Sequence, residues 1–232
     1  MKAQAVSDQD RIWDYWQNAS ESPFSGVFPR LHFIACRIQP GTRALNIGIG
    51  DATLERMLID KGVEVFSIDP SERAIAKANQ FMNGNARVGR IEAIEFEDGY
   101  FDSVVMSEVL EHLDEETAVS GLCEVRRVLA PNGQFIGTVP DNERLSDNEV
   151  ICPCCGNLFH RWGHLRSFNA TSLQSLLSGT FATTAVESQF FSEPLSAGPG
   201  RWISGKLKSL ASYLRLGPYG TARNLFFLAK CQ

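Results

Sequence analysis

Short apolar runs alternate with amphipathic segments between residues 41 and 140, and this alternation is the strongest constraint on the fold. The apolar runs predict strands at 44–47, 63–68, 86–88, 101–106 and 134–139. The segments between them predict helices at 53–61, 71–81, near Val109 and at 122–129. Strands that alternate with helices form a mostly parallel sheet with right-handed crossovers, so we predict an α/β fold with helices flanking the sheet.

The second half of the chain is less regular. It predicts a helix at 171–177, a strand at 183–191, a basic helix at 202–214 and a last strand at 224–229. The two late strands favour an antiparallel hairpin at one sheet edge. We divide the chain into an N-terminal helical cap at 1–40 and a main domain at 41–232. The main domain carries a Cys/His-rich insert at about 148–168 and a helical insert at about 194–220.

The composition is that of a globular protein, because 44% of the 232 residues are hydrophobic and 21% are charged. The formal net charge of −5 argues against sequence-independent binding of nucleic acid. No apolar stretch reaches the roughly 20 residues of a membrane-spanning helix, and the first residues lack the apolar core of a secretory signal. Three of the six cysteines are crowded together, which favours a reducing compartment, so we predict a cytoplasmic protein.

A glycine-rich turn follows the first predicted strand, over residues 46–52, and an acid, Asp69, ends the next strand. Glycines at such a turn allow the backbone to approach a ligand closely. A carboxylate at the end of the second strand can accept hydrogen bonds from both hydroxyls of a ribose. The alternative interpretation is that the glycines serve helix packing and that Asp69 only caps the helix after Ser71.

The spacing of the turn also indicates which nucleotide it suits. A dinucleotide-binding turn would place a third glycine where Thr53 stands, and the turn lacks the Gly-Lys-Ser/Thr ending that grips phosphates. An adenosine-like ligand with no pyrophosphate therefore fits better than NAD, and a nicotinamide-dependent enzyme is a disfavoured alternative.

With these features the sequence resembles the class I S-adenosylmethionine-dependent methyltransferases of the broad type 11 group, over about residues 43–140. The closest matches are the stretches 96–113 and 127–134. The family's first motif is acidic-x-Gly-x-Gly-x-Gly, and here Asn46 replaces the acid and Ala52 replaces the last glycine. The resemblance implies a Rossmann-like fold and an S-adenosylmethionine site formed by Asn46, Ile47, Gly48, Gly50, Asp69, Pro70, Arg90, Ile91, Ser107 and Glu108.

Arg90 stands where the family usually has an aspartate that binds the adenine amino group. A guanidinium cannot accept a hydrogen bond. We therefore expect the adenine to stack beneath Arg90 or to be held by the backbone at Ile91.

His112 is the candidate catalytic base, because the resemblance places it near the methyl group of the cofactor. Glu108, Glu111 and His112 have the i, i+3, i+4 spacing of one helical face. The stretch resembles that of some ubiquinone-biosynthesis O-methyltransferases, which use a divalent cation there. The favoured interpretation of these three residues is nevertheless that His112 packs against the following loop and that the glutamates are solvated.

The insert contains a C-x2-C-x4-H-x3-H array formed by Cys152, Cys155, His160 and His164. Four such ligands predict a closed, structural zinc site that orders a loop over the active site. The alternatives for the cysteines are a metal-free turn or a redox pair. The alternative for His164 is that it faces the substrate.

The basic helix at 202–214 has an apolar stripe flanked by cations, Arg201, Lys206, Lys208 and Arg215. It could contact anionic lipid or a lipid-linked acceptor, but a lid or an ordinary surface helix is the favoured interpretation. The predicted activity is methylation of a hydroxyl on a small metabolite or a glycan. The main alternative is a non-catalytic S-adenosylmethionine-binding or interaction module, which the departures at Asn46 and Arg90 favour.

Overall fold

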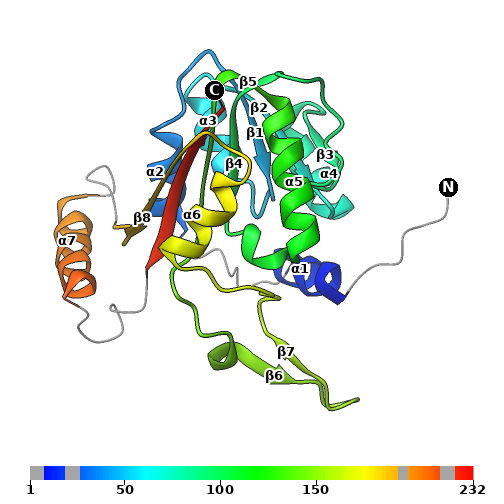
Figure 1. The fold of residues 1–232 in the computed structure, drawn as a ribbon. Coiled ribbons are helices and arrows are strands. Elements are labelled where there is room, and N and C mark those ends of the chain that lie inside the picture. The colour runs from blue at the N-terminus through cyan, green and yellow to red at the C-terminus, as the bar shows by residue number, and fades with distance from the viewer. Residues whose placement is uncertain (1–7, 19–26, 193–197, 215–222, 232) are drawn as a thin grey trace.

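The computed structural model describes residues 8–18, 27–192, 198–214 and 223–231, which fold around a seven-stranded sheet (Figure 1). The strand order is β3-β2-β1-β4-β5-β9-β8. Their bounds are β1 Arg43–Ile47, β2 Glu64–Asp69, β3 Ala86–Val88, β4 Phe101–Ser107, β5 Leu129–Pro140, β8 Thr183–Gln189 and β9 Asn224–Lys230. Strands β1 to β5 pair in parallel, and β9 is antiparallel to both β5 and β8. The predicted α/β, mostly parallel sheet with an antiparallel edge is confirmed.

Most of the helices flank this sheet, and the last described helix stands apart beyond the β8 edge (Figure 1). The helices are α1 Asp8–Asn18, α2 Phe28–Ala35, α3 Thr53–Asp60, α4 Glu72–Met82, α5 Glu115–Val128, α6 Ala170–Ser178 and α7 Pro199–Tyr213. Short 3-10 turns cover Leu110–His112 and Leu145–Asn148. A separate two-stranded hairpin, β6 Glu149–Ile151 with β7 Leu158–His160, projects from the body.

The central strands are buried on both faces, which explains their nearly continuous apolar sequences. In β1, Leu45 and Ile47 belong to one hydrophobic core and Ala44 belongs to the other. In β4, Val104 packs into the first core and Val105 into the second. Because side chains alternate along a strand, each strand anchors both helical layers.

The sequence-based prediction was wrong after β4, where it expected a helix near Val109 and a separate helix beginning at residue 122. The chain instead forms a short 3-10 turn and then one long helix, α5, that begins at Glu115. The side chain of Asp114 accepts a hydrogen bond from the Thr117 amide and caps this helix. The first turn of α5 is polar, so apolar periodicity alone missed it.

Two of the predicted segments are only partly described. Residues 1–7 and 19–26 of the expected N-terminal cap, and residues 194–197 and 215–220 of the expected helical insert, lie outside the described residues, and so does Arg215. The described part of the helical insert is α7. Among the described residues, no helix combines the length and apolar character needed to cross a membrane.

Candidate functional site

A cavity of about 420 Å³ lies at the carboxyl ends of β1 and β4. Ligands bind at this edge in open α/β sheets, because the crossovers leave the sheet in opposite directions from the two strands. All ten predicted cofactor residues line the cavity: Asn46, Ile47, Gly48, Gly50, Asp69, Pro70, Arg90, Ile91, Ser107 and Glu108. His112 lines it too, whereas His164 is not among the lining residues.

The glycine turn and the acid at the end of β2 meet at one point of this cavity. The Ile49 amide donates a hydrogen bond to Asp69 Oδ2 at 3.0 Å, and the Ser71 amide donates to Oδ1 at 2.8 Å. Gly48 has φ +85°, and a Cβ at this position would lie 2.6 Å from Val109 Cγ2. Only glycine therefore allows the turn to approach Val109 so closely.

The buried carboxyl group of Glu55, on α3, lies behind the turn and is one functional candidate that the sequence analysis missed. Asn46 Nδ2 donates a hydrogen bond to Glu55 Oε1 at 2.7 Å, and Ser67 Oγ donates to the same oxygen at 2.8 Å. Burial raises the pKa of Glu55 to about 7, although these two hydrogen bonds oppose the shift. The family motif has its acid at the position of Asn46. In this chain the carboxyl group is instead that of Glu55, which is hydrogen-bonded to the Asn46 side chain. The asparagine in place of an acid was the signal that a compensating acid could lie nearby.

Arg30, on α2, is a second residue that the sequence analysis missed. Its Nε donates a hydrogen bond to Ser107 Oγ at 3.1 Å, and its Nη1 lies 3.7 Å from Glu108 Oε2. Asn224 Nδ2 donates to both Glu108 oxygens, at 3.1 and 3.0 Å. A lone arginine in the N-terminal segment belongs to no motif, so the sequence does not reveal that Arg30 contacts Ser107 and Glu108.

The prediction that Glu108, Glu111 and His112 share one helical face is wrong, and the backbone at Glu108 shows why. Its backbone has φ +58°, which is not helical, and the following turn is a 3-10 turn. Its carboxylate is directed to Arg30 and Asn224. The predicted i, i+3, i+4 face therefore does not form.

His112 ends this turn and is buried, with 8% of its surface exposed. Its Nδ1 lies 3.0 Å from the Gly163 carbonyl oxygen and 3.3 Å from Trp13 Nε1. Burial, and then the nearby His164, lower the pKa of His112 to about 3. The imidazole is therefore neutral at neutral pH, and a base of such low pKa accepts a proton weakly.

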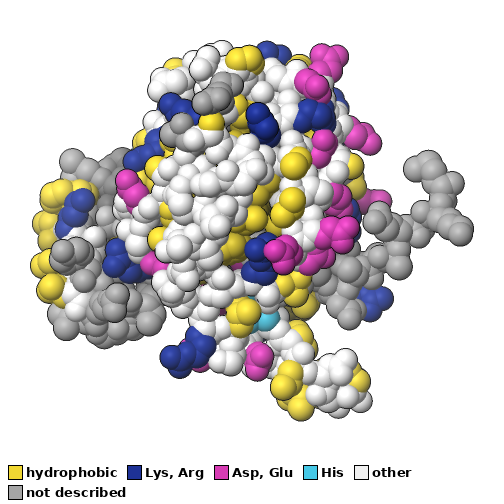
Figure 2. Space-filling model, viewed as in Figure 1, with side chains coloured by type: hydrophobic (Ala, Val, Ile, Leu, Met, Phe, Trp, Pro, Cys, Tyr) yellow, Lys and Arg dark blue, Asp and Glu magenta, His cyan; other side chains and the backbone are white. Residues whose placement is uncertain are grey.

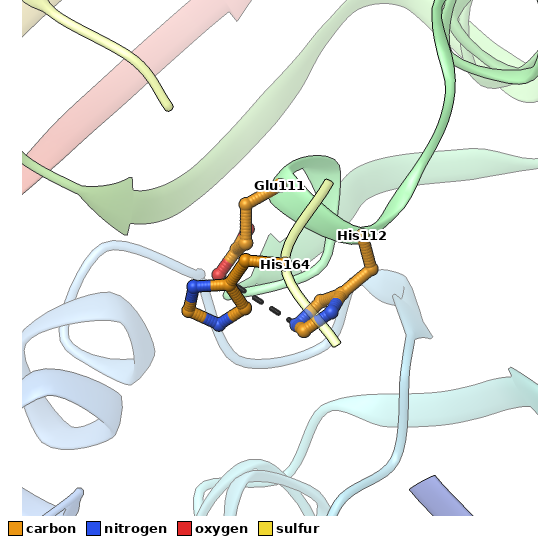
Figure 3. Close-up of side chains that lie close together, drawn as sticks. All are labelled: Glu111, His112 and His164. Atoms are coloured by element: carbon orange, nitrogen blue, oxygen red, sulfur yellow. Dashed lines mark ion pairs between the residues drawn. The ribbon is translucent and has the colours of Figure 1, made fainter. Parts of the chain in front are cut away.

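Glu111, His112 and His164 gather beside the cavity, with one ligand atom of each within 4.8 Å of the others (Figure 3). Glu111 is 1% exposed, and neither of its carboxylate oxygens has a hydrogen-bond partner among the described residues. Burial, and then Glu108, raise the pKa of Glu111. Within the described residues, the one ion-pair contact of this carboxylate joins Oε1 to His112 Nε2 at 3.9 Å (Figure 3). A buried carboxylate without a hydrogen bond is costly, and such a group beside two imidazoles suits a divalent cation. These residues therefore fit the cation that the sequence resemblance implied, with His164 in place of Glu108.

Glu143 organises the histidines of the insert. His164 Nδ1 contacts Glu143 Oε2, and His160 Nε2 lies 3.4 Å from Oε1. His160 Nδ1 accepts a hydrogen bond from the His164 amide at 3.0 Å, so a neutral His160 carries its proton on Nε2. Burial alone would raise the pKa of Glu143, but its hydrogen bonds with His164 and Asn148 and its electrostatic interactions with His164 and His160 outweigh burial and lower the pKa.

The predicted zinc site of Cys152, Cys155, His160 and His164 does not form within one chain. All six cysteines and all four histidines are among the described residues, and none of the groups of three or more ligand atoms found among them includes a cysteine. His160 pairs in register with Glu149 and is buried, whereas the cysteines lie in the turn beyond the strands. A spacing that allows four ligands therefore does not bring them together.

Helix α1 holds the insert against the cavity. Trp16 Nε1 donates a hydrogen bond to the Arg161 carbonyl oxygen at 3.0 Å, and the rings of Trp16 and Trp162 lie 4.6 Å apart. Trp13, one turn earlier, lines the cavity and contacts His112 edge to face. Two tryptophans of one helix therefore join the insert to the site.

Comparison with protein families matches residues 45–137 to the model described as "Methyltransferase domain". The chain is 30% identical over 139 residues to a ubiquinone biosynthesis O-methyltransferase from Xanthomonas axonopodis pv. citri. This match covers 56% of each protein, so the chain spans about half the length of the curated relatives it matches.

Solved structures share the whole fold at low sequence identity. An S-adenosylmethionine-dependent methyltransferase from Archaeoglobus fulgidus has a TM-score of 0.66 at 18% identity, over 90% of this chain and 95% of that one. A Burkholderia thailandensis 1,6-didemethyltoxoflavin-N1-methyltransferase, solved with bound 1,6-didemethyltoxoflavin and S-adenosylhomocysteine, has a TM-score of 0.66 at 14% identity, over 97% of this chain and 87% of that one. At such identities the likeness shows the fold alone.

Proposed function

Residues 45–137 belong to the class I S-adenosylmethionine-dependent methyltransferases, and from that premise we propose that this chain transfers a methyl group from S-adenosylmethionine to a small-molecule acceptor. The observation that carries the proposal is the meeting of the Gly48 turn with Asp69 on one cavity. A carboxylate at the end of the second strand is the group that accepts hydrogen bonds from ribose hydroxyls in this kind of site.

In this proposal each wall of the cavity holds one part of the cofactor. Asp69 binds the ribose, and the glycine turn admits the backbone close to the methionine portion. Arg90 and the backbone at Ile91 enclose the adenine. Asn46 Oδ1, which is buried without a hydrogen-bond partner among the described residues, gives the methionine end an acceptor in place of the family acid.

The sulfonium methyl is already electrophilic, so the protein has to align the acceptor with the methyl–sulfur bond and exclude water. Trp13, Leu31 and Leu165 supply apolar walls for this purpose. We propose a hydroxyl of a small metabolite as the acceptor, with a glycan hydroxyl as the second choice. The name of the Xanthomonas relative, an O-methyltransferase of ubiquinone biosynthesis, supports oxygen as the methylated atom.

The acceptor hydroxyl must lose its proton, and His112 alone is a weak base for that step because of its low pKa. The Glu111–His112–His164 group could hold a divalent cation, with Glu143 orienting His164 from behind. A cation bound there would lower the pKa of a coordinated hydroxyl. In this proposal His112 remains a catalytic residue: its neutral imidazole lines the cavity and would be one ligand of the cation.

Two further parts of the proposal rest on composition. The six free cysteines support a cytoplasmic location, and the net charge of −5 gives no support for nucleic acid as a partner. Contact of α7 with anionic lipid is a weaker possibility that its exposed leucines and its lysines would allow. The non-catalytic module remains the alternative function, because Asn46 and Arg90 depart from the family at cofactor contacts.

The proposal is tested by release of S-adenosylhomocysteine from S-adenosylmethionine in the presence of a panel of phenols, catechols and sugars. We expect turnover with at least one hydroxyl acceptor, and its loss in Asp69→Ala. Addition of EDTA tests the cation separately. Turnover that survives chelation would refute the role of the cation and leave the proposed methyl transfer standing. Binding of S-adenosylmethionine without turnover of any acceptor would favour the non-catalytic module.

A further inference from the structure

The turn of the β6–β7 hairpin carries three cysteines far from the site described above. Cys154 and Cys155 are exposed and Cys152 is partly exposed. In Figure 1 the hairpin projects beyond the sheet and its helices, and Figure 2 shows hydrophobic side chains on the projecting lobe. Nothing in the proposed methyl transfer uses these thiols.

The hairpin turn has the geometry of half a zinc site. The Gly156 amide donates to the Cys152 carbonyl oxygen at 2.9 Å, and the Cys152 amide donates to the Asn157 carbonyl oxygen at 2.8 Å. Backbone amides of Cys155 and Cys154 hydrogen-bond to the sulfur of Cys152. Gly156 has φ +76°, which closes the turn behind Cys155. These backbone hydrogen bonds place Cys152 and Cys155 on one closed turn, with backbone amides beside the first sulfur.

Two thiolates do not complete a structural zinc site, which needs four ligands. His160 and His164 are held by Glu143 and by each other within the insert. Cys154 does not form a group of three close ligand atoms with Cys152 and Cys155. The other three cysteines lie elsewhere: Cys36 follows α2, Cys123 is on α5 and Cys231 follows β9. The segments outside the described residues contain neither cysteine nor histidine. A structural zinc bound by Cys152 and Cys155 would therefore take its other two thiolate or imidazole ligands from another molecule.

The surface next to the cysteine pair is apolar and has no partner among the described residues. Ile151 and Leu158 are opposite each other in the hairpin, at the strand ends next to the turn, and are 64% and 67% exposed. Opposite residues of an antiparallel pair lie on the same face, so the two form one patch. Phe159, on β7, is 40% exposed. An isolated two-stranded hairpin is marginally stable in water, and such a patch is typical of a contact surface.

We propose that two copies of this chain share one Zn²⁺, bound by Cys152 and Cys155 of each copy, with the two Ile151–Leu158 patches packed beside it. A second copy supplies the two thiolates that are missing, and a twofold axis through the metal gives both hairpins the same environment. Soft thiolate ligands in a tetrahedral arrangement select zinc among the common divalent ions. The site is structural, because all four positions are taken by protein.

The test is the mass of the full untagged chain in solution, measured by light scattering after gel filtration with and without ZnCl₂. A reductant that contains no thiol keeps disulfides from forming. We expect a monomer without metal, a doubled mass with Zn²⁺, about 0.5 zinc per chain by elemental analysis and reversal by EDTA. Cys152→Ser and Cys155→Ser should each abolish both the doubled mass and the bound zinc.

Two controls keep the result specific to this pair. Cys154→Ser and Cys123→Ser remove other exposed thiols and should dimerise with zinc as the wild type does. Binding of S-adenosylmethionine by the Cys152→Ser variant would show that its main domain is still folded. A chain that stays monomeric with zinc, that binds one zinc per chain as a monomer, or that dimerises equally in Cys152→Ser would overturn the proposal.

Discussion

The glycine turn at β1 and the Cys/His insert both carry motifs, yet only the first motif has the geometry that its spacing predicts. At the glycine turn, Ile49 and Asp69 are 20 residues apart in sequence and are joined by a 3.0 Å hydrogen bond. In the insert, His160 and His164 lie close to Cys152 and Cys155 in sequence but bind Glu143 instead.

The difference lies in what positions the residues. The turn and Asp69 follow β1 and β2, and the parallel register of these strands, Ile47 with Ile68, forces their ends together. The insert is a hairpin in which His160 pairs with Glu149 at the end opposite the turn that carries the cysteines. The strands of the hairpin therefore hold the histidines away from the cysteines. The sheet therefore sets the positions of motif residues that follow neighbouring parallel strands. Motif residues on a hairpin are positioned by contacts with other side chains, here Glu143, which the spacing of the motif does not reveal.

The largest expected change with pH concerns Glu55, behind the glycine turn. Its folded pKa of about 7 lies above the ordinary value of 4.5, so the folded state holds this proton more tightly than the unfolded state. The resulting stabilisation is complete below about pH 4.5 and is lost as pH rises through about 7, a change of about 3 kcal/mol. Urea unfolding from pH 4.5 to 8 should therefore show a smaller fall in the free energy of unfolding for Glu55→Gln than for wild type. An identical pH dependence in the two proteins would contradict the assignment.

Gly48→Ala should destabilise the fold by ~2–4 kcal/mol, because it adds a clash with Val109 to the cost of a positive φ. Gly41→Ala is the matched control. Gly41 has φ +76° but no heavy atom within 4 Å of an added Cβ, so only the backbone cost of ~1–2 kcal/mol applies. Equal shifts in urea midpoint for the two variants would show that the close approach to Val109 is unimportant.

In the insert, Glu143→Gln should give a pH dependence of the opposite sign to Glu55→Gln. The pKa of Glu143 is lowered in the folded state, so its stabilisation is present above its ordinary pKa and is lost as pH falls. Because Glu143 is only partly buried, we expect a loss of about 1 kcal/mol at pH 7. The same urea series measures it, and a variant that is as stable as wild type at pH 7 would show that the histidine contacts contribute nothing.

The smallest expected effect is that of Trp16→Phe, which keeps a ring against Trp162 but removes the N–H donor to Arg161. We expect a loss of about 0.5–1 kcal/mol. Amide hydrogen exchange at residues 158–165 should become faster while exchange in β1 and β4 stays unchanged. Unchanged exchange in the insert would mean that α1 does not hold it.

The sheet, its antiparallel edge and the cavity-lining residues could be predicted because each follows from a strand pattern and from where parallel strands end. Glu55 and Arg30 could not, since a buried acid in a helix and a lone arginine have no distinctive spacing. The segment Leu110–His112 forms a 3-10 turn and not the predicted helix, and the burial of its polar residues Glu111 and His112 leaves no apolar period in the sequence. The partnership of Glu143 with His164 joins residues 21 apart across the insert, and no periodicity reports such a contact.

The central claim is that the glycine turn and Asp69 bind one S-adenosylmethionine, and calorimetric titration of that cofactor tests it most directly. We predict micromolar binding to the wild type, affinity weaker by ~1–3 kcal/mol in Asp69→Ala, and unchanged affinity in Asp60→Ala, whose exposed carboxylate lies at the far end of α3. No binding to the wild type, or equal affinity in Asp69→Ala and the wild type, would contradict the account.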